Sequence, residues 1–116
     1  MNVTNVDLVI MNNSAFQASV EFKEEEIPLD LTGYTFRMQC RPSHRSSTVY
    51  FELDSSPNGG IVVTQSVGRI QINIPATQTA TFDFLDGVYD VTAEKPDGTV
   101  LRAMEGNVFI NFGVTR

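Results

Sequence analysis

Cys40 and His44 are the only cysteine and the only histidine in the chain, and they lie four residues apart. A thiol beside an imidazole is the arrangement of a cysteine nucleophile, and both side chains also bind zinc. One cysteine and one histidine cannot complete a tetrahedral structural zinc site. Cys40 also has the same parity as Tyr34, Phe36 and Met38, so in a strand it belongs to the apolar face, where cysteine behaves as a small hydrophobe. We therefore predict a buried structural thiol and no catalytic residue.

Two acidic groups offer oxygen ligands of the kind that calcium prefers. Residues 24–26 are three glutamates that precede Asp30, and Asp83, Asp86 and Asp90 gather further along the chain. Neither group has the Asp-x-Asp-x-Asp-Gly spacing of a dedicated calcium loop, and a charge run at a strand end is usually solvated. The sequence predicts no metal and no other cofactor, with a divalent cation on these acidic loops as the alternative.

The only local concentration of basic residues consists of Arg37, Arg41, His44 and Arg45. Arg37 and Arg41 should project from the polar face of their strand, and Arg45 from the loop that follows it. Guanidinium groups placed in this way can bind carboxylates of a partner protein. We predict a partner-binding site at Arg41, His44 and Arg45; the alternative is that these are ordinary solubilising charges.

Length and composition limit the classes of protein that remain. The chain has 116 residues, which suits a single domain over 1–116, and its net charge of −6 disfavours nucleic acid as a partner. A single cysteine excludes an internal disulfide and fits synthesis in a reducing compartment. The apolar stretch 8–11 is too short for a signal core or a membrane span, so we expect synthesis in a cytoplasm and no membrane partner. The turn at 58–60 lacks the residues of a phosphate loop, which gives no reason to expect a small-molecule substrate.

Apolar residues on alternate positions predict the strands that must carry these groups. The pattern appears over 16–22, 34–40 and 49–53, and two further runs, 61–63 and 69–74, flank a short hairpin loop at 65–68. Residues 24–28 and 76–82 are too short and polar to bury a helical stripe, so they are interpreted as corners that a 3₁₀ turn could occupy. Eight or nine short strands without helices between them predict two packed antiparallel sheets.

The last third of the chain predicts an antiparallel meander of strand, turn, strand, turn and strand. Its segments are 87–91, a turn at 96–98, a second turn at Gly106 and a closing strand over 108–116. Tyr89 stands two residues before apolar Val91, the position of a tyrosine corner in immunoglobulin-like folds, although a half-buried strand aromatic is the alternative. The predicted fold is an all-β, immunoglobulin-like antiparallel β-sandwich. Its predicted core is Phe16, Val20, Phe22, Phe36, Met38, Ile70, Ile72, Tyr89, Val91, Ile110 and Phe112.

The order of five segments resembles a family of phage proteins. The segments are 28–36, 37–41, 87–91, 106–108 and 114–116, and in this order they resemble small β-sandwich structural proteins of tailed phages, which include N-terminal domains of upper-baseplate and tail-fibre-attachment proteins. The resemblance implies a non-enzymatic virion structural protein, an adaptor at the tail, baseplate or fibre junction. Its partners would be other virion proteins and copies of itself in a symmetric assembly. The alternatives are a capsid decoration protein and a host-encoded protein-binding β-sandwich module.

Overall fold

Short β-strands form most of the secondary structure in the computed structural model, which describes residues 2–114. The prediction of a mostly β protein is confirmed, and α1 is a single short helix. The elements are β1 (Thr4–Asn5), β2 (Leu8–Met11), β3 (Phe16–Glu21), β4 (Lys23–Glu24), β5 (Ile27–Pro28), β6 (Thr35–Arg41), β7 (Phe51–Asp54), β8 (Ile61–Thr64), the 3₁₀ turn η1 (Gln65–Val67), β9 (Arg69–Ile74), α1 (Ala76–Thr79), β10 (Asp86–Glu94) and β11 (Val100–Asn111).

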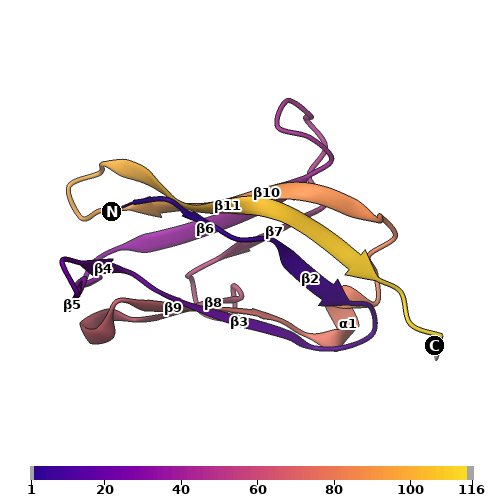
Figure 1. Ribbon diagram of the computed structural model, residues 1–116, viewed down its shortest axis with the longest axis horizontal. Helices are drawn as coiled ribbons and strands as arrows, with labels where there is room; N and C mark the ends of the chain where they lie inside the picture. Colours follow the sequence, from indigo (N-terminus) through magenta and orange to yellow (C-terminus); the bar gives the residue numbers. More distant parts are fainter. Residues whose placement is uncertain (1, 115–116) are drawn as a thin grey trace.

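The strands form two layers with a small hairpin at one end (Figure 1). The larger sheet has the order β1-β11-β10-β6-β7, and β2 also pairs with β11. The smaller sheet has the order β3-β9-β8, and the predicted hairpin between β8 and β9 is confirmed. The hydrophobic core lies between the two layers, so residues of the larger sheet alternate between this core and an outer face.

The prediction that all pairing is antiparallel is wrong at the N-terminal edge of the larger sheet. Both β1 and β2 run parallel to β11, and they share one register, in which Thr4 pairs with Met104 and Leu8 pairs with Val108. The larger sheet is therefore mixed. Strand pairing between segments so far apart in the sequence leaves no local pattern of turn residues, and this is why the sequence did not indicate it.

Gly106 is not a turn, and this corrects the predicted three-stranded meander. β10 and β11 form a single hairpin around a turn at 95–99, and β11 continues through Gly106 as far as Asn111. A Cβ atom at Gly106 would lie 2.1 Å from the carbonyl oxygen of Val6, so glycine is required here for close approach of the N-terminal segment. Thr115 and Arg116, the end of the predicted closing strand, lie outside the described residues.

The two predicted corners take different forms. The segment 24–28 is the β4–β5 hairpin, whose turn residues Glu25 and Glu26 have φ angles of 51° and 68°. The segment that begins at Ala76 contains one turn of α-helix, and the 3₁₀ turn lies instead at Gln65–Val67, in the β8–β9 loop.

Most of the predicted core is buried, but three of its members are not fully covered. Phe16, Val20 and Phe112 are only partly buried, because β3 is an edge strand and Phe112 lies beyond the end of β11. The other predicted residues are buried, namely Phe22, Phe36, Met38, Ile70, Ile72, Tyr89, Val91 and Ile110.

Tyr89 is an interior strand residue and not a corner residue. It lies within β10, opposite Cys40 of β6 and Gly106 of β11, and it is buried. Its hydroxyl donates a hydrogen bond of 2.6 Å to the Val6 carbonyl oxygen, far away in the sequence. Tyr89 therefore fixes the N-terminal segment at the point where Gly106 admits it.

Candidate binding surface

The loop 41–47, which follows β6, projects from the outer side of the larger sheet (Figure 1). Arg41, at the end of β6, fixes this loop. Its Nη1 donates to the Ser46 carbonyl oxygen over 2.8 Å, and its Nη2 donates to Gln39 Oε1 over 2.8 Å. The half-buried Arg41 guanidinium is thus engaged within the chain, and its first role is to hold the loop in place.

His44 and Arg45 are exposed residues of this loop, as are Pro42, Ser43 and Ser47. His44 lines a hollow of about 410 Å³ together with residues 5–7 and 105–107, and a smaller one of about 100 Å³ that also reaches Asp90. The loop therefore lies over β10, β11 and the N-terminal segment. Within the described residues, the Arg45 side chain makes no hydrogen bond or ion pair, which leaves its guanidinium available to a partner.

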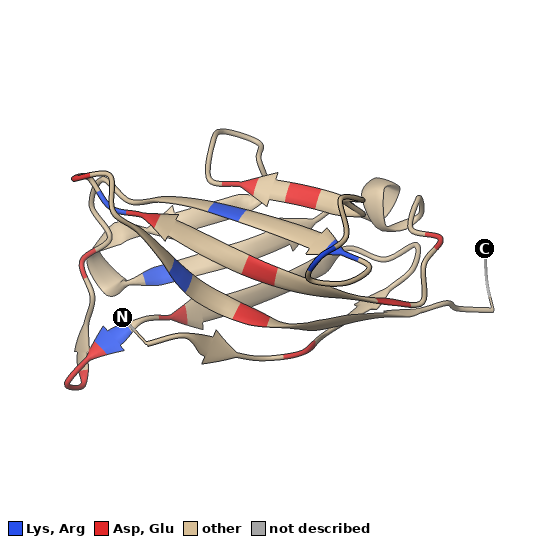
Figure 2. Cartoon of the chain, turned by 90° about the horizontal axis from the view of Figure 1, so that it is seen from above, with Lys and Arg blue, Asp and Glu red and all other residues tan. Residues whose placement is uncertain are grey.

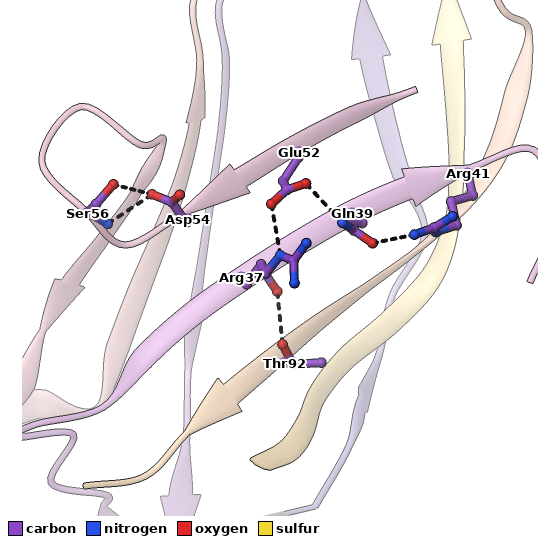
Figure 3. Close-up of polar contacts among 7 residues, drawn as sticks. All are labelled: Arg37, Gln39, Arg41, Glu52, Asp54, Ser56 and Thr92. Carbon is purple, nitrogen blue, oxygen red and sulfur yellow. Dashed lines mark hydrogen bonds and ion pairs between the residues drawn. The ribbon is translucent and has the colours of Figure 1, made fainter. Parts of the chain in front are cut away.

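A ladder of polar side chains crosses from β6 to the edge strand β7 (Figure 3). Glu52 accepts a hydrogen bond of 2.8 Å from Arg37 Nε and one of 2.9 Å from Gln39 Nε2. The bonds from Arg37 and Gln39 lower the pKa of the Glu52 carboxyl group, while Glu52 raises the pKa of Arg37. Arg37 projects from the polar face as predicted, but its charge is already paired within the chain.

The outer face continues in the same way on β10 and β11. Arg102 lies 3.7 Å from a carboxylate oxygen of Asp90 and 3.4 Å from one of Glu105. Figure 2 shows basic and acidic positions distributed over this face of the larger sheet. Since these charges compensate one another locally, Arg45 and His44 are the polar groups of this surface best placed for a partner.

Cys40 and His44 are not brought together as a catalytic pair. Cys40 faces the core and is 0% exposed, and burial raises the pKa of its thiol to about 12. His44 lies in the exposed loop on the outer side of the sheet. The prediction that Cys40 is buried is confirmed, since the side chain lies in the hydrophobic core.

The two acidic groups named from the sequence lie on different elements. Glu25 and Glu26 form the tip of the β4–β5 hairpin, whereas Asp86 and Asp90 lie along β10. Among residues 2–114, no group of three or more histidine, cysteine, aspartate or glutamate side chains is arranged to hold a metal ion.

An open hollow between the edges of β7 and β8 had no counterpart in the sequence predictions. It has a volume of about 950 Å³, and the loop 55–60 forms part of its wall. The carboxylate of Asp54 fixes the start of this loop by accepting bonds from the backbone N–H, over 3.0 Å, and from the hydroxyl of Ser56. Asn73 Oδ1 is buried beside it without a hydrogen-bond partner among the described residues. The turn residues at 58–60 were the only signal of this loop in the sequence.

Comparison with known proteins identifies no family. No protein-family model matches the chain, and no curated protein matches it. Separately, no helix formed by the described residues is long and apolar enough to cross a membrane.

Proposed function

We propose that this chain is a non-enzymatic structural protein of a tailed-phage particle, an adaptor at the tail, baseplate or fibre junction. The observation that carries the proposal is the loop 41–47. Arg41 fixes it, His44 and Arg45 are exposed on it, and the neighbouring charges of the outer face are paired within the chain. A fixed loop with an available guanidinium is suited to binding carboxylates on a partner. The phage assignment is supported by the order of segments described above.

The same proposal includes an immunoglobulin-like sandwich as the fold. The two stacked layers and the central position of β10 in the larger sheet support this architecture. The parallel N-terminal strands add to the larger sheet without changing the order of its antiparallel strands. A sandwich of this kind offers surface loops and strand edges to partners, which fits a role in assembly.

The test is to count copies of the chain in purified particles that carry Arg45→Glu. Arg45 is preferred to Arg41, since Arg41 supports the loop and its replacement would also disturb the loop's conformation. Lys23→Glu is the matched control, because Lys23 is an exposed cation on the β4–β5 hairpin, at the end of the molecule away from the loop (Figure 1). We expect reduced occupancy for Arg45→Glu and normal occupancy for Lys23→Glu.

Each contrary outcome removes a stated part of the proposal. Normal occupancy of Arg45→Glu would remove the loop from the interface. Absence of the unmodified chain from mature particles would overturn the virion assignment and favour a host-encoded binding module. Recovery of the chain with isolated capsids and not with tails would replace the adaptor by a capsid decoration protein.

A further inference from the structure

The four residues of β2 form an edge of the larger sheet that combines exposed apolar side chains with no charge. Edge strands usually carry charges that prevent pairing with other chains. Such charges are present on β7, which has Glu52 and Asp54, and on β3, which ends at Glu21. The edge strand β8 also has no charge, but Val62 is its one exposed large apolar residue, and β1 is only two residues long. β2, with the sequence Leu-Val-Ile-Met, has no charge and exposes two large apolar side chains, Val9 and Met11.

Backbone groups of β2 point toward its open side. The N–H of Asn12 donates to the Asn111 carbonyl oxygen over 2.9 Å, so this group faces β11. Because successive peptide groups of a strand point to opposite sides, the N–H groups of Val9 and Met11 point away from β11. Among the described residues, no strand pairs with that side of β2.

An apolar strip lies on the outer face beside this open edge. Val9 is 52% exposed, Met11 is 50% exposed, and Phe109, which pairs with Val9 in the neighbouring strand, is 42% exposed. The alternate residues Leu8 and Ile10 are buried beneath the sheet. The strip therefore adds apolar area to an edge that offers the outward N–H groups of Val9 and Met11, although the Met11 carbonyl oxygen already accepts from the Ser14 N–H over 3.3 Å.

The layer below is incompletely covered on the same side. The short turn 12–15 connects β2 to β3, which is the edge strand of the smaller sheet. Phe16 and Val20 of β3 pack against the core but remain only partly buried. A partner that extended the larger sheet at β2 would also shield these side chains from water.

We propose that β2 pairs antiparallel with β2 of a second copy of this chain, which continues the larger sheet across a two-fold axis. The net charge of −6 makes two copies repel each other, so a contact between copies is favoured where neither contributes a charge. β2 meets this condition. A two-fold axis at Ile10 places Val9 of each copy opposite Met11 of the other, with the outward N–H groups of both residues facing the other copy.

This pairing deepens the assembly role proposed above and rests on it for the expectation that copies meet. Its test uses the purified chain alone, with sedimentation equilibrium as the readout, and is therefore distinct from the count of copies in particles. Either result can fail without the other.

Val9→Lys is the decisive variant, because lysine on an edge strand opposes strand addition and Val9 is outside the core. Val62→Lys is the matched control, since Val62 is 53% exposed and lies on the edge strand β8 of the other sheet. We expect the mass of two chains for the unmodified protein and for Val62→Lys, and of one chain for Val9→Lys, with unchanged far-ultraviolet spectra. A single-chain mass for the unmodified protein at its highest soluble concentration would overturn the proposal. So would a dimer that persists in Val9→Lys, or one lost equally in Val62→Lys.

The register is tested by disulfide formation between Val9→Cys and Met11→Cys chains, mixed and treated with an added oxidant that accepts the two hydrogen atoms lost by the thiols. Directly opposed residues lie within disulfide reach, whereas diagonal ones are about 7–8 Å apart. Cys40 is buried and does not compete. We expect mixed chains to cross-link faster than either variant alone, and faster cross-linking of Val9→Cys alone would overturn the axis at Ile10.

Discussion

The inner and outer faces of β6 come from alternate residues of one strand, and they differ in how strongly they are held. The inner row, from Phe36 to Cys40, is at most 2% exposed and packs in the core. On the outer row, Arg37 is bonded to Glu52 of β7, but the two side chains are 59% and 41% exposed. Water competes with the exposed Arg37–Glu52 pair, whereas it is excluded from the inner row. Stability should therefore depend on the inner face, while the outer face remains free to change for recognition.

Phe36→Ala should have the largest effect. The Phe36 ring stacks on Phe22 at a centroid distance of 6.2 Å and is 2% exposed, so its removal leaves a cavity within the core. We expect a loss of about 3–5 kcal/mol in the free energy of unfolding, measured with urea. A loss below about 1 kcal/mol would contradict the burial of this ring.

Gly106→Ala should come next, because the added Cβ would meet the Val6 carbonyl oxygen at 2.1 Å. The N-terminal segment must then move away from β11. We expect about 2–3 kcal/mol of destabilisation and faster amide exchange at Val6, whose N–H donates to Glu105. Unchanged exchange at Val6 would show that the segment is not held by this contact.

Tyr89→Phe removes the hydrogen bond to Val6 but keeps the buried ring. We expect a loss of about 1 kcal/mol in urea unfolding, which is typical of one hydrogen bond. Because Tyr89 and Gly106 act on the same carbonyl group, the double variant with Gly106→Ala should lose less than the sum of the two single losses. If the two single losses add up in the double variant, Tyr89 and Gly106 stabilise the fold independently of each other.

Alkaline pH should weaken the inner face through Cys40. Burial raises the pKa of this thiol from 9.0 to about 12, so the folded chain keeps a proton that the unfolded chain releases above about pH 9. Stability should therefore fall as the pH rises from 9 towards 12, and the fall should be shallower in Cys40→Ala. Tyr89, whose pKa is raised by burial and then by Asp7 and Glu105, acts in the same direction and is retained in that control.

Arg37→Ala, on the outer face, should have the smallest effect on folding. Exposed ion pairs contribute little to stability, so we expect no measurable change in the urea midpoint. The pKa of Glu52 should nevertheless rise towards its ordinary value, because the bond from Arg37 is the largest cause of its decrease. NMR titration of Glu52 measures this pKa directly. A lower urea midpoint together with an unchanged Glu52 pKa would contradict the expectation that the outer face contributes little to stability.

Apolar alternation and turn residues were sufficient to predict elements that depend on neighbours in the sequence. The alternation over 34–40 predicted β6 and the burial of Cys40, and the short Gly-containing link predicted the β8–β9 hairpin. The same reasoning failed where distant segments meet. Gly106 has the composition of a turn, and only the approach of Val6 explains why a strand passes through it.

For the candidate site, the sequence predicted the residues but not the bonds that they make. The sequence identified a basic loop with Arg41, His44 and Arg45, but not which of these guanidinium groups is already occupied. Arg41 bonds to Ser46, five residues away, whereas Arg45 has no bond among the described residues. The sequence also did not show how far residues of edge strands are buried. Phe16 follows the same alternation as a central core residue, but it is only partly buried because its strand lies at the edge of the smaller sheet.

The parallel pairing of β1 and β2 with β11 also affects the order in which the chain can fold. On the ribosome, Thr4 and Leu8 emerge 100 residues before their partners Met104 and Val108. β1 and β2 must wait for the intervening residues, at roughly 5–20 residues per second, before they can dock. Closing so long a loop makes this the entropically most demanding step, so docking of the first strands should complete folding and not initiate it.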